Sequence, residues 1–540
     1  MQPENKEKNK NIVKDPATLF VRICGIFLFS IVSVLLAYLT FQSARISMYS
    51  SNKYSGYNWP VEIADSLPKN LLFSLAAIAV IYACFLFEKK HQKASAIISY
   101  ISLVLVLILY TVLGIIYVKT TPYYPSGDQI NTTAAALYAL EGNYSMFTPM
   151  GYIGICPHQK GLLFFYEIIF KFFGPLNFTA AGMINLLLND LTILTGYFLI
   201  KELRGGYAPR FLWTIFTALL LPYFILIPYA YGDLPSVFGI MVFVFFFIKF
   251  LNSGKIIYAL LSAPGAAFAI LNRSSAWIAV FALIIVSFLI SVQRKKISPL
   301  ITMLAVTVFS YACLFFINVG YEKLSGFDRH TGSPTIAYIA MGMQTTDGAS
   351  GVYNRYHQEV YERYDGNKAL ASEEAKEYIS ERLSEFREYP GLAKDFYRNK
   401  ILLQWIEPMF ESNTHMKSFK EGISLETLSP FYIRAYVGDI HIIMFKMMNK
   451  YQTLIYLLCL ISSVRALICL IKNKKEPMTI HWFFSIFMLG GFIFSLIWEA
   501  KARYSLPYFI FLIPVSVLLF TDLKAFPRFG NKQEETEHQQ

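Results

Sequence analysis

The strongest constraint on this chain is its series of apolar runs, because a helix needs about 20 apolar residues to cross a bilayer. Only 16% of the 540 residues are charged, against about 25% in a soluble domain. The runs lie at 19–41, 71–87, 96–118, 179–202, 210–230, 235–251, 256–271, 274–292, 299–320, 452–472, 481–498 and 504–521. The sequence therefore predicts an all-α polytopic membrane protein with about 12 to 13 transmembrane helices and excludes an ordinary soluble enzyme.

The net charge of +12 does not indicate a nucleic-acid-binding surface, because Lys and Arg gather in short loops between the apolar runs. With the N-terminus inside, basic loops such as 88–93, 293–296 and 472–475 all face the cytoplasm, as the positive-inside rule requires. The first run lacks a signal-peptide cleavage site and is too long for a signal-peptide core. We therefore expect a multi-pass cell-membrane protein with both termini in the cytoplasm.

This topology divides the chain into parts. The expected parts are cytoplasmic tails at 1–18 and 522–540, a transmembrane domain at 19–320 with a first outer loop at 119–178, an extracytoplasmic domain at 321–451, and C-terminal transmembrane helices at 452–521. In the outer domain, 372–388 has the charge pattern of a solvated helix that Pro390-Gly391 ends. Residues 161–173 are apolar but too few for a span, so we expect a helix in the outer interface.

The six cysteines predict no disulfide framework and no zinc site. Five of them lie inside apolar runs, where a thiol behaves as a small hydrophobe. Only Cys156 falls in an expected loop, and no Cys/His spacing suited to zinc is present.

Two acids in outer loops are the first candidates for chemistry. Asp128 ends the sequence Pro125-Ser126-Gly127-Asp128, and Asp233 lies in a short hairpin between two runs. Turn and helix-capping chemistry is the structural alternative for both. An acid at the bilayer edge is costly, however, and such acids are usually functional. The topology places both acids on the same side, which predicts a catalytic pair.

Cations on the outer side form the second group of candidates. Lys160, Arg273, Lys501 and Arg503 all run against the positive-inside rule, and a phosphate ligand would explain them. The structural alternative is snorkelling and ion pairing, since Glu499 and Arg503 would share one helix face. The residues that we expect to support this site are Tyr231, His158, Glu499 and Tyr504.

Polar residues also lie within the fourth run, at Asn185, Asn189 and Asp190. Hydrogen bonds between helices account for them, and an ion pathway is the functional alternative. The chain has no Walker A sequence, no dinucleotide-binding fingerprint, no H-E-x-x-H and no G-x-S-x-G. An outward-facing transferase without a nucleotide site needs a substrate activated in the membrane, and a polyprenyl-phosphate sugar meets that need. A loop carboxylate would deprotonate the acceptor, and the cations would stabilise the departing phosphate.

The sequence resembles the membrane-embedded GT-C glycosyltransferases, in the family 39-like branch of protein mannosyltransferases and aminoarabinose lipid A transferases. The resemblance covers about 96–320 and 480–521. It is carried by Ser126-Gly127-Asp128, by 157–163 with Phe172-Phe173-Gly174, by 231–235, and by 499–504 with Pro507. Many relatives have Asp-Glu in the first loop, where this chain has Asp128-Gln129.

The resemblance implies transfer of a sugar from a polyprenyl-phosphate donor to an extracytoplasmic glycan, lipid or protein of the cell envelope. It places the catalytic acids at Asp128 and Asp233, and the donor phosphate near Lys160, Lys501 and Arg503. We expect base catalysis without a metal and no cofactor, with a divalent cation left open. Membrane lipids are expected partners and nucleic acid is not. The alternative function is a transporter or flippase for a lipid-linked glycan.

Overall fold

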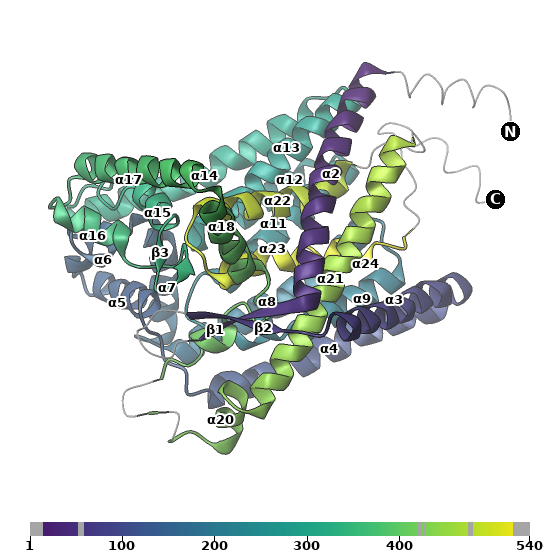
Figure 1. The fold of residues 1–540 in the computed structure, drawn as a ribbon, viewed down its shortest axis with the longest axis horizontal. Helices are drawn as coiled ribbons and strands as arrows, with labels where there is room; N and C mark the ends of the chain where they lie inside the picture. The colour runs from purple at the N-terminus through teal and green to yellow at the C-terminus, as the bar shows by residue number, and fades with distance from the viewer. Residues whose placement is uncertain (1–14, 52–58, 420–422, 425–426, 473–478, 522–540) are drawn as a thin grey trace.

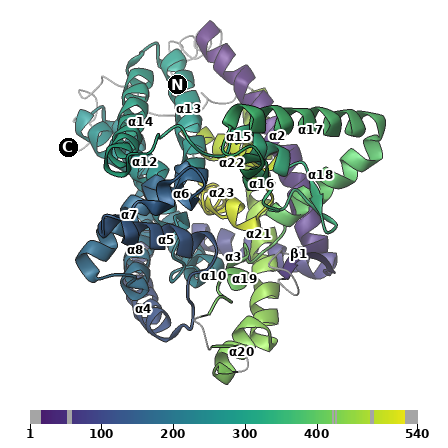
Figure 2. The ribbon, with the colours of Figure 1, turned by 90° about the vertical axis from the view of Figure 1, so that its left-hand side faces the viewer.

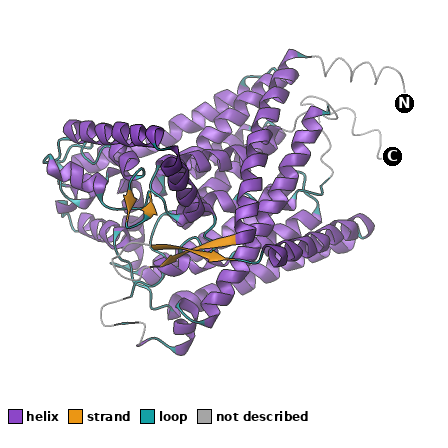
Figure 3. Cartoon of the chain, in the orientation of Figure 1, coloured by secondary structure: helices purple, strands orange, loops and turns teal. Residues whose placement is uncertain are grey.

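The computed structural model describes residues 15–51, 59–419, 423–424, 427–472 and 479–521. Of the described residues, 78% are helical, and the described strands form only two small antiparallel sheets (Figure 3). Within the described residues, eight helical segments are long and apolar enough to cross a membrane: α2 (Pro16–Arg45), α3 (Leu67–Lys90), α4 (Gln92–Thr120), α8 (Phe178–Glu202), α11 (Asp233–Ser253), η3 with α13 (Ser274–Ala276, Trp277–Arg294), α14 (Ser298–Ser325) and α20 with α21 (Pro430–Tyr436, Asp439–Ile471). The expectation of an all-α polytopic membrane protein is confirmed at this level.

Shorter helices occupy the other expected spans. They are α9 (Tyr207–Leu219), α10 (Leu221–Ile225), α12 (Ile256–Asn272), α22 (Trp482–Ile497), and the chain of η6 (Ala502–Ser505), α23 (Leu506–Ile510) and α24 (Ile513–Val517). The prediction of one span at 210–230 does not hold as a single helix, because the helix breaks at Leu220 and α10 starts at Leu221 with Pro222 in its first turn. Pro507 and Pro514 divide the last run in the same way, since proline cannot continue a preceding helix without losing a hydrogen bond.

The bundle has a clear centre and periphery. In the most apolar stretch of α11, 78% of the residues are buried, whereas in that of α14 only 17% are. α11 packs against α8 and α12, and α2 and α21 lie side by side along one flank (Figure 1). A helix that exposes apolar side chains all round is suited to lipid rather than water.

The polar residues of the fourth span form hydrogen bonds between helices, as the simpler interpretation expected. The Asn185 amide donates to the carbonyls of Ile227 and Tyr229 at 3.0 and 3.1 Å. Asn189 donates to the carbonyl of Tyr223 at 3.1 Å, and Asp190 accepts from Thr111 at 2.7 Å. These contacts tie α8 to α4, to α10 and to the loop that leads into α11.

The segment after α14 forms a small helical layer at one end of the bundle. It contains α15 (Thr335–Met341), β3 (Thr345–Thr346), β4 (Ala349–Ser350), α16 (Tyr356–Arg363), α17 (Lys368–Glu388), α18 (Pro390–Trp405) and α19 (Ser412–His415). The expected helix at 372–388 is confirmed within α17, and Pro390 opens α18 immediately afterwards. α21 begins at Asp439, so the expected boundary at 451 falls inside a helix.

The first outer loop lies against this layer (Figures 1 and 2). It contains α5 (Asp128–Leu140), η1 (Ser145–Phe147), α6 (Tyr152–Ile155), η2 (Pro157–Gln159) and α7 (Lys160–Phe173). Ile155 shares a small buried cluster with Ala337, Val360 and Ala371 of the layer. At 14 residues α7 is about 21 Å long, short of the ~30 Å hydrocarbon core, and its place in the interface stays a prediction.

A β-hairpin that the sequence did not predict lies at the same end. β1 (Ile46–Ser51) and β2 (Trp59–Ala64) pair antiparallel, with Ile46 opposite Ala64. The Met48 amide also donates to the carbonyl of Ile406 at 3.1 Å, so the hairpin contacts the turn after α18. All six cysteines are free, as expected.

Candidate active site

Three polar side chains from distant parts of the chain meet at this end of the bundle. Asp233 begins α11, Arg273 follows α12, and Arg503 lies in η6 after the turn that ends α22. Gly232 makes this approach possible, because a Cβ there would lie 2.0 Å from the carbonyl oxygen of Asn272. A residue with a side chain would push the start of α11 away from the end of α12.

Asp233 is held between the two arginines. Its Oδ1 accepts from Arg273, and its Oδ2 lies 3.2 Å from Nη1 of Arg503. The side chains of Asp233 and Arg503 are only 2% and 3% exposed, and that of Arg273 is 13% exposed. A buried carboxylate with both oxygens paired is suited to positioning cations rather than to taking a proton from a substrate.

Aromatic rings surround the two guanidinium groups. The Arg503 guanidinium lies 4.9 Å from the ring centroid of Tyr229 and 5.0 Å from that of Tyr231. Arg273 lies 4.9 Å from the ring of Tyr504. Such rings stabilise a desolvated cation by cation–π attraction, so they help to keep both arginines charged and in place.

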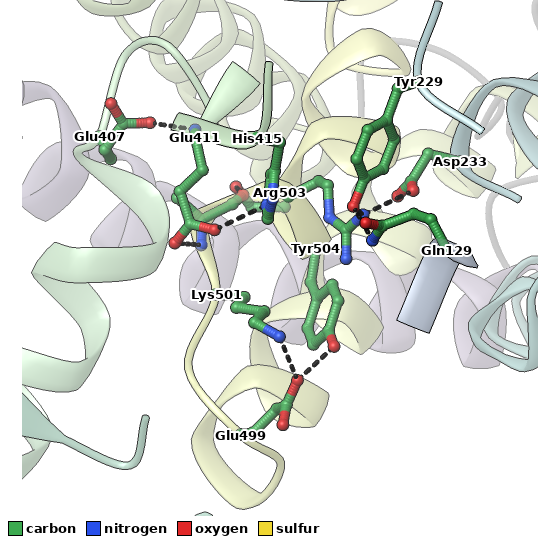
Figure 4. A network of polar contacts seen from close by, with 12 residues as sticks. Gln129, Tyr229, Asp233, Glu407, Glu411, His415, Glu499, Lys501, Arg503 and Tyr504 are labelled. Carbon is green, nitrogen blue, oxygen red and sulfur yellow. Dashed lines mark hydrogen bonds and ion pairs between the residues drawn. The ribbon is translucent and has the colours of Figure 1, made fainter. Parts of the chain in front are cut away.

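Glutamine side chains connect the first outer loop to these tyrosines. Gln129 of α5 donates to the Tyr229 hydroxyl at 2.6 Å, and Arg503 donates to the same oxygen (Figure 4). Gln159 donates to the Tyr231 hydroxyl at 2.6 Å. Gln129 stands where many relatives have Glu. Its hydrogen bond gives it a structural role that the sequence did not reveal.

Lys501 is the third cation of the cluster. The pairing of Glu499 with Arg503, which the structural alternative offered for a helical segment, does not form, because α22 ends at Ile497 and residues 498–501 are not helical. Glu499 instead lies 3.4 Å from Nζ of Lys501 and accepts from the Tyr504 hydroxyl. Burial is the largest single effect and would lower the pKa of Lys501, but the charges of Glu499, Asp128 and Glu411 together outweigh it, so the pKa is raised. Lys501 therefore carries its proton at neutral pH.

Asp128 differs from Asp233 in its exposure and in its pairing, the two properties that matter for proton transfer. It is exposed at the first position of α5, and its carboxylate makes no hydrogen bond or ion pair with any described residue. Its charge nevertheless contributes to raising the pKa values of Lys501 and Tyr353, so it faces the same space. The structure therefore brings a carboxylate that has no partner among the described residues within electrostatic reach of Lys501.

The layer after α14 supplies acids and a histidine that the sequence did not single out. Glu411 Oε1 accepts from the amide of Ala502 at 3.1 Å, directly between Lys501 and Arg503. Its other oxygen lies 3.2 Å from Nε2 of His415, whose ring packs 5.2 Å from that of Tyr229 (Figure 4). Glu411 thus fixes the backbone that carries two of the cations.

The backbone that carries Glu411 is strained. Phe410 and Glu411 both adopt left-handed conformations, with φ of 48° and 55°, at a cost of about 1–3 kcal/mol each. Glu407 accepts from the Glu411 amide at 2.7 Å, and burial raises the pKa of Glu407 to about 8. In the sequence, Glu407, Glu411 and His415 follow one another at intervals of four residues. This spacing was the available sign that the three side chains belong together.

Aromatic side chains from the layer cover another side of the cluster. Tyr338 is stacked between His357 and Trp498, with centroid distances of 4.0 and 5.2 Å. The Tyr353 ring lies 5.2 Å from Nζ of Lys501. Burial lowers the pKa of His357 to about 4, so this ring is neutral. Stacked rings of this kind offer flat apolar surfaces beside a polar site.

Two expected site residues, Lys160 and His158, form no hydrogen bond or ion pair with either arginine among the described contacts, although His158 lies within reach of the charge of Arg273. Lys160 is buried at the start of α7, and burial lowers its pKa while Glu322 and Asp328 raise it. The acids near Lys160 are thus at the end of α14 and beyond it. His158 packs edge-on against Tyr338, with centroids 6.0 Å apart. Within the described part of the chain, no group of three His, Cys, Asp or Glu side chains is arranged to hold a metal ion.

Comparison with models of protein families finds none that matches this chain, and no curated protein matches it.

Proposed function

We propose that this protein is a membrane-embedded glycosyltransferase of the GT-C type, which transfers a sugar from a polyprenyl-phosphate donor to an acceptor in the cell envelope. The observation that carries the proposal is the exposed carboxylate of Asp128, which has no partner among the described residues, within electrostatic reach of Lys501, together with the paired cations Arg273 and Arg503. The proposal also places this site at the extracytoplasmic face, on the strength of the basic loops at the other end of the helices.

The proposed reaction assigns one task to each group. Asp128 takes the proton from a hydroxyl group of the acceptor. At the same time, the oxygen of that hydroxyl group forms a bond to the anomeric carbon of the sugar. The bond from that carbon to the phosphate oxygen breaks, and the polyprenyl phosphate leaves as an anion. General base catalysis contributes roughly 10²–10⁴-fold in such steps, and preorganised cations stabilise the charge that develops on the leaving group.

Asp233 has a different task in this proposal from the one expected of a second catalytic acid. Since both of its oxygens are paired with arginines, it positions Arg273 and Arg503 for the phosphate. Glu411 does the same for the backbone between Lys501 and Arg503. The cations are then fixed before the donor arrives, which lowers the cost of reorganisation.

The alternative of a transporter or flippase gains no support from the fourth span. Asn185, Asn189 and Asp190 make hydrogen bonds within the bundle, as structural residues do. Asp128, the exposed acid at the start of α5, lies at the end of the bundle rather than at its middle.

The proposal is tested with full-length protein in liposomes supplied with a panel of polyprenyl-phosphate sugars and an envelope extract as acceptor. Release of polyprenyl phosphate is followed for the parent protein, for Asp128→Asn and for Glu141→Gln. Glu141 is the matched control, because it is an exposed acid at the opposite end of the same helix. We expect release to fall by about 10²-fold or more in Asp128→Asn and to stay unchanged in Glu141→Gln. Equal release from all three proteins would contradict the proposal.

A further inference from the structure

An apolar cavity of about 180 Å³ lies inside the helical bundle, between α2, α21, α22 and the segment around α24. Most of its lining is apolar, including Val32, Leu36, Trp482 and Met488. An apolar cavity of about 150 Å³ stays dry and takes up apolar molecules. In a protein surrounded by lipid, the apolar group available to fill it is a segment of a lipid chain.

The cavity is remote from the candidate active site. α22 begins beside it at Trp482 and ends at Ile497, next to the turn that carries Glu499. The 16 residues of this helix span about 24 Å. A lipid with its headgroup at the cavity would therefore belong to the membrane leaflet opposite the site.

One end of the cavity is polar. Arg465 lines it from α21 and is exposed, although it lies six residues before the helix ends at Ile471. It donates to the carbonyls of Leu519 and Thr521, and since arginine has five N–H groups, others remain without a partner among the described residues. A cation at this depth is costly unless it has an anionic partner or reaches the headgroups.

Two buried polar atoms near this end of the bundle have no hydrogen-bond partner among the described residues. One is the hydroxyl of Thr521, whose carbonyl accepts from Arg465. The other is Nε2 of His481, which also lines the cavity. Buried polar groups normally have a partner, and a phosphate bound to Arg465 would supply one for the Thr521 hydroxyl.

We propose that this cavity is a binding site for one anionic phospholipid of the leaflet opposite the active site, with a chain segment inside and the phosphate on Arg465. Charge complementarity selects an anionic headgroup over a zwitterionic one. The short basic loops at that end of the bundle also attract anionic lipids to the leaflet opposite the active site. The site is independent of the proposed transferase activity.

The test measures lipid retained by the full chain after purification from mixed micelles that contain phosphatidylglycerol, phosphatidylcholine and a polyprenyl phosphate. Native mass spectrometry identifies and counts the bound lipid. Arg465→Gln removes the charge, and Arg465→Lys keeps it. Ala466→Phe fills the cavity, whereas Val464→Phe on the same helix is exposed and lies outside the lining, which makes it the matched control.

We expect one phosphatidylglycerol on the parent protein, with retention roughly tenfold or more weaker in Arg465→Gln. Retention should also be lost in Ala466→Phe and kept in Val464→Phe and, in large part, in Arg465→Lys. Preference for the polyprenyl phosphate, or equal retention of all lipids by all variants, would overturn the proposal. If Ala466→Phe does not fold, the comparison of Arg465→Gln with Arg465→Lys still decides it.

Discussion

Asp233 pairs each of its oxygens with a different arginine, and the arrangement of the cations depends on it. Removing one partner of a buried ion pair costs about 3–5 kcal/mol, because a buried charge is left unpaired. Asp128 has no such pairs, and its loss removes at most a favourable helix-terminus interaction of about 0.3–1 kcal/mol. The two acids should therefore behave differently when each is replaced by asparagine.

We predict that Asp233→Asn lowers the thermal unfolding temperature of the detergent-purified protein markedly, while Asp128→Asn leaves it nearly unchanged. Both substitutions should reduce sugar transfer, Asp128→Asn without unfolding. Thermal unfolding followed by intrinsic fluorescence gives the comparison. An Asp233→Asn protein as stable as the parent would show that the arginines do not depend on this carboxylate.

Glu407 should make the stability of the protein depend on pH. Its pKa is raised to about 8 by burial, against an ordinary value of 4.5, so the folded state binds more protons than the unfolded state between these values. The free energy of unfolding therefore falls as pH rises from about 4.5 to 8. Glu407→Gln should remove this part of the fall, so that the variant gains stability over the parent at pH 8 relative to pH 5. A difference between the two proteins that does not change with pH would contradict the assignment.

At the level of residues, the sequence points to candidates where the chemistry is local. Asp128, Lys501 and Arg503 stand in short loops whose charge conflicts with their place beside a bilayer, and this conflict is visible in the sequence. The partners of these residues were not visible, because Glu411 meets Ala502 across 91 positions of the chain. The expected pair of Glu499 and Arg503 depended on a helix that ends at Ile497.

At the scale of elements, the contact between the start of α11 and the end of α12 sets the distance between Asp233 and Arg273. Gly232 allows this contact, since any Cβ there would overlap the carbonyl of Asn272. The two helices are the most closely associated pair in the bundle's centre, and they cannot shift without disturbing its packing.

We predict that Gly232→Ala reduces sugar transfer by about tenfold or more, because a displacement of about 1 Å at the reacting groups can cost 10²-fold. Gly320→Ala in α14 is the control, as nothing lies within 4 Å of the added Cβ. That substitution should preserve activity and leave the unfolding temperature equal or slightly raised, since alanine favours a helix over glycine. Full activity in Gly232→Ala would show that the hairpin tolerates displacement.

Helix positions were largely predictable because apolar runs fix them, whereas breaks and extensions were not. Pro222, Pro507 and Pro514 divide expected spans, yet Pro264 lies inside α12 without ending it. Whether proline ends a helix depends on how neighbouring helices satisfy the freed carbonyls. The start of α21 at Asp439 was missed because its first turns contain His441 and Lys446 between apolar residues.

At the scale of the whole molecule, the account requires that α5 and the loop at 293–296 lie on opposite sides of the membrane. Single cysteines test this in a background where the six free cysteines have been replaced. We predict that Glu141→Cys reacts with an impermeant maleimide added to intact cells, and that Lys296→Cys reacts only after the cells are permeabilised. Both positions are exposed, so a lack of reaction reports sidedness. The reverse pattern would place the candidate site in the cytoplasm.

The central claim is that Asp128 is the base of a transferase that uses a polyprenyl-phosphate sugar. Its most direct test compares envelope glycans and polyprenyl-phosphate sugars in cells that lack the gene, in cells with Asp128→Asn and in cells with the parent gene. The account predicts the same missing sugar substituent and the same build-up of donor in the deletion and in Asp128→Asn cells. Normal glycans in Asp128→Asn cells, with a defect in the deletion alone, would contradict it.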